Sequence, residues 1–120
     1  MAAQRGAGTL MVAVIMAVIL LVTGVGLLVS VVALAQRDAA NAADLSALSG
    51  AAAFVKGQDS CAAASRIAAS NGVELRSCHV SGDAVDFVVS VEVQRRLELA
   101  LGLRPTVRAE AHAGRLGSAR

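Results

Sequence analysis

Aromatic side chains are nearly absent from this sequence. Its 120 residues include no tryptophan or tyrosine and only two phenylalanines, Phe54 and Phe87. Ligand pockets are usually lined by aromatic side chains, and proteins that bind single-stranded nucleic acid stack bases on them. The net charge of +2 is also too small for a surface that must neutralise many phosphates. The composition therefore argues against a small-molecule substrate and against nucleic acid as a partner.

Catalytic and metal-binding motifs are missing as well. No glycine-rich phosphate loop follows a predicted strand, and no nucleophile stands in a recognisable catalytic motif. The histidines, His79 and His112, and the cysteines, Cys61 and Cys78, match no zinc-binding spacing. We therefore predict that the protein is not an enzyme and has no cofactor and no metal site.

One long apolar run dominates the chain. Residues 6–36 carry no charge and lie between Arg5 and the pair formed by Arg37 and Asp38. About 20 apolar residues cross the hydrocarbon layer of a bilayer as a helix, and this run is apolar on every face. We predict a short leader, residues 1–6, and then a single-pass transmembrane helix over residues 7–35. The flanking charges place the C-terminal domain outside the cytoplasm.

The same run has a second interpretation, a secretory signal peptide. A cut near Ala35 fits the small-residue cleavage pattern and would release a small secreted binding module. The apolar core of a signal peptide is normally about 7 to 15 residues long, much shorter than this run. Length therefore favours a retained helix, in which Gly24, Gly26 and Ser30 are small positions where another helix could approach closely.

Residues 36–56 are predicted to continue this helix outside the membrane, to about Val55. They contain no proline and are rich in alanine, which has the highest helix propensity. Apolar side chains recur along one face at spacings of three and four, and we expect the small domain to dock on this stripe. The stripe consists of Leu45, Leu48, Ala52 and Val55. Polar side chains expected to stay in water are Arg37, Asp38, Asp44 and Ser46.

Residues 57–113 are predicted to form a small exported domain, followed by a disordered tail over residues 114–120. A short helix over 61–70 precedes three strands. The expected strand bounds are 73–80, 84–93 and 106–112. The second strand alternates most clearly between apolar and polar residues, follows a tight turn at 81–83, and is joined to the third by a connection that can be helical. The predicted class is α+β, a long N-terminal transmembrane helix that continues into a domain with a short helix and a three-stranded antiparallel sheet.

Two further features of this domain carry chemistry. Cys61 and Cys78 lie in the part expected to be exported, where disulfides form. We expect a disulfide between the short helix and the first strand, which would stabilise the domain by roughly 3 kcal/mol. Two buried free thiols are the alternative. Arginines make the last third basic, which is typical of solvated surface or of a contact with anionic lipid headgroups or an acidic partner. They are Arg95, Arg96, Arg104, Arg108, Arg115 and Arg120.

The order of several segments resembles a known family. Residues 6–12, at the start of the apolar run, are similar to the start of TadE-like minor pilins and pseudopilins of the tight-adherence (Flp) pilus. Residues 37–48 resemble the segment after the span in an actinobacterial branch, the secretion/helicase-neighbourhood TadE-like proteins. The similarity continues through Cys61, Cys78 and the valine-rich strand around Phe87, so it covers nearly the whole chain.

The resemblance implies a processing site and partners. A prepilin peptidase would cut between Gly6 and Ala7, and the helix would be held in the membrane and contact other pilin-like or secretion-apparatus subunits. Pilins usually carry a glutamate five residues after the cleavage site, where this chain has Met11. Methionine cannot pair with a neighbour's N-terminal amine. The resemblance therefore implies a membrane-anchored accessory or minor subunit that acts by helix packing and protein contacts.

Overall fold

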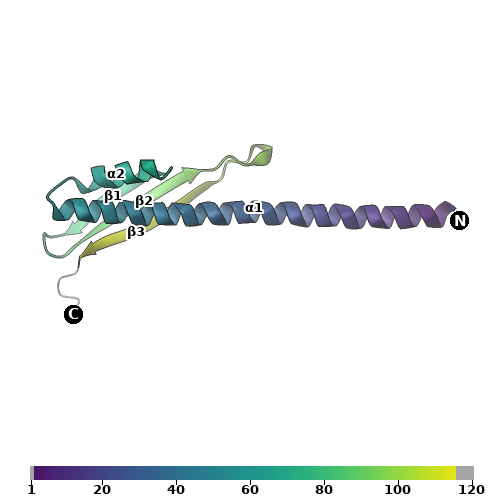
Figure 1. Cartoon of the computed structure of the whole chain (residues 1–120), viewed down its shortest axis with the longest axis horizontal. Coiled ribbons are helices and arrows are strands. Elements are labelled where there is room, and N and C mark those ends of the chain that lie inside the picture. Colours follow the sequence, from purple (N-terminus) through teal and green to yellow (C-terminus); the bar gives the residue numbers. More distant parts are fainter. Residues whose placement is uncertain (1, 116–120) are drawn as a thin grey trace. The chain divides into compact units, whose positions relative to one another are not determined.

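The computed structural model describes residues 2–115. In chain order they form α1 (Ala2–Val55), α2 (Ser60–Ser70), β1 (Glu74–Gly82), β2 (Phe87–Arg96), the 3-10 turn η1 (Ala100–Gly102) and β3 (Thr106–Arg115) (Figure 1). The chain divides into two compact units, one that ends at Ala33 and one that begins at Leu34. The predicted α+β class is confirmed, with a long apolar N-terminal helix, a short helix and a three-stranded antiparallel sheet.

Helix α1 continues to Val55, as its alanine-rich sequence without proline predicted. The Gly57 N–H donates to the Phe54 carbonyl at 3.0 Å, and the Gln58 N–H donates to the Ala53 carbonyl at 2.8 Å. Gly57 has a φ of 73°, a left-handed conformation that costs glycine little and commonly terminates helices. The chain therefore reverses at Gly57 and enters α2.

Helix α2 is fixed at its first turn by a cap and a disulfide. The Asp59 carboxylate accepts a hydrogen bond from the Ala62 N–H at 3.1 Å, which satisfies one of the free donors at the helix start. Cys61 is bonded to Cys78 on β1, with their Cα atoms 5.8 Å apart. The predicted disulfide is therefore confirmed, and it ties α2 to an edge strand of the sheet.

The sheet has the order β1-β2-β3, so β2 is the central strand. Phe87 lies opposite Gly82 on one side and Arg115 on the other. Strand β3 runs three residues further than predicted, so Gly114 and Arg115 belong to the sheet rather than to a disordered tail. The rest of the predicted tail, residues 116–120, lies outside the described residues.

The turn between β1 and β2 also lies later than predicted, at residues 83–86. The Asp83 N–H donates to the Asp86 carbonyl at 2.8 Å, and the Asp83 carboxylate accepts from the Val85 and Asp86 N–H groups at 2.9 and 2.8 Å. Because this side chain occupies the amides that strand pairing would use, β2 begins only at Phe87. Val85, predicted on the buried face of the strand, is therefore exposed.

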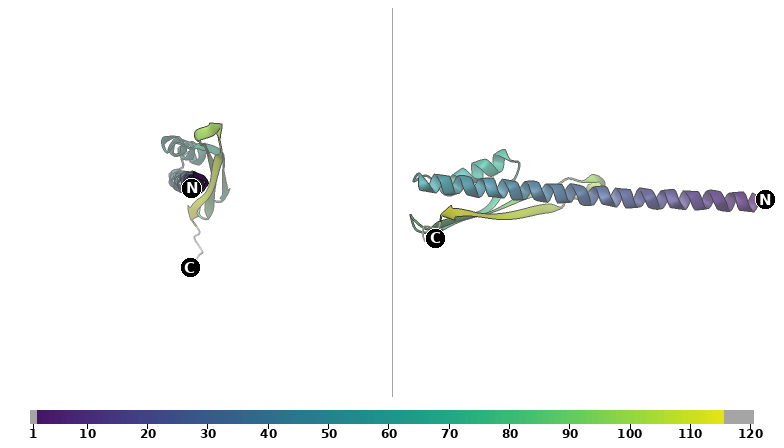
Figure 2. Two further views of the ribbon diagram at one scale, coloured as in Figure 1. Left: turned by 90° about the vertical axis from the view of Figure 1, so that its right-hand side faces the viewer. Right: turned by 60° about the horizontal axis from the view of Figure 1, so that its bottom comes forward.

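The core of the second unit lies between one face of the sheet and the two helices, which Figure 2 shows on the same side of it. The inward residues of β2 are buried as predicted: Phe87, Val89, Val91 and Val93. The rings of Phe54 and Phe87 pack with centroids 4.3 Å apart. At Gly50, a Cβ atom would come within 3.0 Å of a Val89 methyl and 3.1 Å of the Ser60 carbonyl oxygen. The helix therefore approaches its neighbours as closely as glycine and alanine allow.

The prediction that the small domain docks on the stripe of Leu45, Leu48, Ala52 and Val55 is wrong. Its large side chains are exposed, with Leu45 at 48%, Leu48 at 59% and Val55 at 64%. The buried face of α1 in the second unit consists of small residues instead: Ala35, Ala39, Ala42, Ala43, Ser46, Ala47, Gly50 and Ala53. Ser46, predicted to stay in water, is completely buried. The close approach of helix and sheet leaves no space for leucine side chains, so these point outward.

Candidate functional site

The first candidate surface is the outside of α1 in the first unit. From Gly6 to Val31 almost every side chain is exposed, although most of them are large and apolar; Leu10, for example, is 68% exposed and Leu27 is 64% exposed. Within the described residues this is the only helix long and apolar enough to cross a membrane, judged by length and composition. A helix that is apolar on every face needs lipid or protein around it.

The small positions predicted for helix packing lie open on this surface. A Cβ atom added at Gly24 or Gly26 would meet nothing within 4 Å. The Ser30 hydroxyl donates to the Gly26 carbonyl at 2.9 Å, so its hydrogen atom is used within the helix. Ser30 therefore offers a second helix a small, internally satisfied side chain. That another helix packs here stays a prediction.

The predicted processing site lies within the first turns of α1. Gly6 and Ala7 are helical, and a Cβ atom at Gly6 would meet nothing within 4 Å. Met11 is 67% exposed on the helix surface. Its thioether carries no charge, so it cannot supply the carboxylate that a neighbour's amine would require. Cleavage at this bond also stays a prediction.

The second candidate surface is the outward stripe of α1 in the second unit, formed by Leu45, Leu48, Ala52 and Val55 and called here the outer stripe. All four residues are exposed. Their spacings of three, four and three are those of a seam along which helices pack together. Apolar side chains at such spacing that face solvent mark an interaction site. The sequence analysis found these residues but assigned them to contacts inside the chain.

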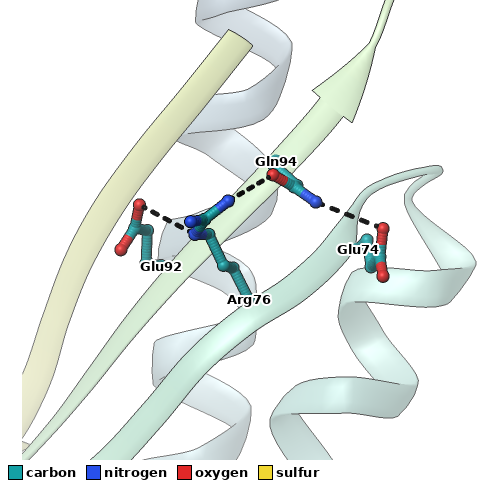
Figure 3. Close-up of polar contacts among 4 residues, drawn as sticks. All are labelled: Glu74, Arg76, Glu92 and Gln94. Atoms are coloured by element: carbon teal, nitrogen blue, oxygen red, sulfur yellow. Dashed lines mark hydrogen bonds and ion pairs between the residues drawn. The ribbon is translucent and has the colours of Figure 1, made fainter. Parts of the chain in front are cut away.

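The outer face of the sheet is polar and forms a third surface. Arg76, at the irregularity in β1, donates to the Gln94 amide oxygen at 3.0 Å and lies 3.9 Å from Glu92, while the Gln94 amide donates to Glu74 at 3.4 Å (Figure 3). These side chains project on the face opposite the helices. They link β1 to β2 through exposed polar contacts, each of which contributes little to stability.

The same face brings together Ser90 and His112, which sequence reasoning did not connect. The Ser90 hydroxyl lies 2.8 Å from His112 Nδ1, and the pair lies in a shallow depression of about 100 Å³ together with His79 and Glu110. Only the register of β2 against β3 reveals this pairing. In the described part of the chain, no group of three or more histidine, cysteine, aspartate or glutamate side chains is arranged to hold a metal ion.

The two ends of the sheet differ in charge. At one end, hydrogen bonds from the N–H groups of Asp86 and Val85 hold the pKa of the Asp83 carboxyl below its usual value. At the other end, three arginines lie at the end of β2 and in the connection from β2 to β3, and the connection also carries two exposed leucines. The arginines are Arg95, Arg96 and Arg104, and the leucines are Leu101 and Leu103. Leu101 has a φ of 67°, which for a residue with a side chain costs about 1 to 2 kcal/mol.

A long, apolar N-terminal helix that continues into a small α+β unit fits a pilin-like subunit. Residues 6–53 match the family described as "Putative Flp pilus-assembly TadE/G-like". This match confirms the resemblance to TadE-like proteins, and the matched residues all lie in α1, so α2 and the sheet are outside it. The family is one of pilus assembly and is not a known enzyme class. The actinobacterial branch stays a prediction.

Comparisons with curated proteins and with solved structures gave no significant match. The match of the helix to a pilus-assembly family and the apolar surface of that helix favour a membrane-anchored protein with an exported domain, and other pilus subunits are the kind of partner that this family suggests.

Proposed function

We propose that this chain is a membrane-anchored accessory or minor subunit of a tight-adherence pilus or a related secretion apparatus, which acts by helix packing and protein contacts. The observation that carries the proposal is the match of residues 6–53 to a pilus-assembly family. These residues lie in α1, whose apolar side chains from Leu10 to Val31 are almost all exposed in the described chain. In this proposal residues 7–35 span the bilayer, residues 36–56 continue the helix outside, and residues 57–113 form the exported domain.

Two features of the helix support an accessory role. Met11 removes the carboxylate with which a pilin in a filament pairs with its neighbour's new amine, so a permanent place in the membrane is favoured. Gly24, Gly26 and Ser30 give a second helix room for close approach. If a prepilin peptidase cuts between Gly6 and Ala7, the helix that remains is still long enough to span the bilayer.

The outer stripe supports protein contacts beyond the membrane. Neighbouring subunits anchored in one membrane have helices that leave it in the same direction, so their extramembrane parts can pack side by side. Leu45 and Leu48 can pack against a neighbouring helix because each exposes about half of its surface or more. The partner we propose is the corresponding helix of another pilin-like subunit.

Site-specific photo-crosslinking in the native cell tests this proposal. A crosslinker in place of Leu48 is expected to capture the apolar helix of a pilin-like subunit in the membrane fraction, as identified by mass spectrometry. The same crosslinker in place of Ser65, exposed on α2, is the matched control and should not capture that helix. Equal capture from both positions, or recovery of the chain only from the medium, would contradict the proposal.

The alternative function is a small binding module released by a signal peptidase near Ala35. It predicts a soluble product that begins at about Gln36 and lacks the apolar helix. Cell fractionation in the crosslinking experiment separates the two functions, because only the proposed subunit remains with the membrane.

A further inference from the structure

We propose that the connection between β2 and β3 is a second membrane contact, in which Leu101 and Leu103 enter the surface of an anionic bilayer and adjacent arginines bind its lipid headgroups. This inference rests on the proposed function, because it requires that α1 be anchored in the membrane. It concerns residues 97–105, which no part of the family match covers.

The first step is the place of this connection within the second unit. The Gln36 side chain donates a hydrogen bond to the carbonyl of Arg108, near the start of β3. Phe54 packs on Phe87, which lies opposite Arg115 at the end of β3. Strand β3 therefore runs alongside α1 from the level of Gln36 to the level of Phe54, and the connection that precedes β3 lies at the end where α1 enters this unit (Figure 1).

That end of the unit is the one held at the membrane surface. The first charged side chains after the apolar run are Arg37 and Asp38, so the proposed span leaves the lipid close to Gln36. The covalent chain thus keeps the start of the second unit at the headgroups. A loop that projects from the same end is within reach of the interface.

The second step is that neither packing nor backbone preference accounts for the leucines. Leu101 is 92% exposed in a left-handed conformation, and Leu103 is 49% exposed. The loop is nevertheless held in shape, because the N–H groups of Leu97 and Leu99 donate to the carbonyls of Pro105 and Leu103 at 2.8 and 2.9 Å. A hydrogen-bonded tip that presents leucines outward has the form of a shallow membrane anchor.

The third step is charge. Arg95, Arg96 and Arg104 flank the tip, Glu98 is its one acidic residue, and none of the three arginines forms an ion pair among the described residues. The opposite end of the sheet carries the acidic turn at residues 83–86. The far end also carries the bases Lys56 and Arg115, so an excess of positive charge is found only at the anchored end, which fits a surface of anionic phospholipid. An acidic protein partner would also match the arginines, and vesicles that contain no other protein separate the two, because only lipid can then change the surroundings of the tip.

The chain contains no tryptophan, so a single introduced tryptophan reports on its own surroundings. Full-length Leu101→Trp and, as the control at the other end of the sheet, Val85→Trp are reconstituted into vesicles. The vesicles contain either phosphatidylcholine alone or equal parts of phosphatidylcholine and phosphatidylglycerol, with a brominated lipid as quencher. In the anionic vesicles, the tryptophan at 101 should show blue-shifted emission and be quenched, and the tryptophan at 85 should not.

The arginines give a second readout that loss of packing would not change. Adding Arg96→Ala and Arg104→Ala to Leu101→Trp should lower the ratio of inserted to free tip about fivefold for each arginine in anionic vesicles, with little effect in phosphatidylcholine alone. Equal emission and quenching at positions 101 and 85 would overturn the inference, and so would insertion that ignores the arginines and the lipid charge. Flotation of the Val85→Trp protein with the vesicles tests the anchor separately, so failure of the proposed function is distinguishable from failure of the tip contact.

Discussion

Replacing Ala47 by leucine should unfold the second unit far more readily than replacing Leu48 by alanine, although the second change removes the larger apolar side chain. Ala47 is completely buried and Leu48 is 59% exposed. A leucine at position 47 must fit where the helix already touches the sheet, and such overpacking typically costs about 1 to 3 kcal/mol. Leu48→Ala is a surface change within the same helix, which we expect to shift stability by no more than about 0.5 kcal/mol.

Hydrogen exchange measures this difference in the full-length protein held in detergent micelles. The amides of β2 lie at the centre of the sheet and report opening of the whole unit. A loss of 1 to 2 kcal/mol changes the folded-to-unfolded ratio about 5- to 30-fold, so Ala47→Leu should speed exchange in β2 by at least that order. If Leu48→Ala speeds exchange as much as Ala47→Leu does, the assignment of the alanine face to the core is refuted.

Three further predictions concern the same unit. Cys61 and Cys78 are 17 residues apart, so breaking their disulfide should lower the free energy of unfolding by roughly 3 kcal/mol. Reduction, or replacement of both cysteines by serine, should therefore speed hydrogen exchange in β2. Unchanged exchange would show that the disulfide does not constrain this unit. The Ser46 hydroxyl is buried without a hydrogen-bond partner in the described chain, so Ser46→Ala should raise stability by about 1 kcal/mol in urea unfolding, and a loss would mean that the hydroxyl has a partner. The pKa of the Asp83 carboxyl is lowered in the folded state, so its contribution to the free energy of unfolding is complete above the unfolded pKa of about 4 and is lost as pH falls through the folded value. The wild-type protein should therefore be more stable than Asp83→Asn at neutral pH, and this difference should shrink on acidification. A difference that grows on acidification would contradict this.

The sequence was a sufficient guide where one local preference decides the structure. The continuation of α1 to Val55 followed from alanine content, and the buried face of β2 followed from the alternation of Val89, Val91 and Val93 with polar residues. The disulfide followed from two cysteines in a segment expected to be exported. Each of these features depends on neighbours in the chain or on cysteine chemistry, which can be read from residue types.

The sequence misled where distance between elements decides the structure. Ranking by hydrophobicity assigns Leu45 and Leu48 to the core, but the separation of helix and sheet admits only small side chains such as Ala43 and Ala47. That separation is a property of the packed unit and does not appear in a helical periodicity. The contact between Ser90 and His112 likewise requires the register of two strands. The sequence therefore identified the residues of the outer stripe, but we assigned them to the core of the unit. They lie on its outer surface, where contacts with another protein would form.

The mature N-terminus of the protein in fractionated cells tests the central claim, that α1 is kept as a membrane helix. Intact mass and terminal sequencing of the membrane fraction should give a chain that starts at Met1 or Ala2, or at Ala7 if a prepilin peptidase acts. Either start preserves the span, and the first favours a permanently anchored accessory subunit. A chain that starts near Gln36 and is recovered from the medium would contradict the account, because the helix would then be a signal peptide.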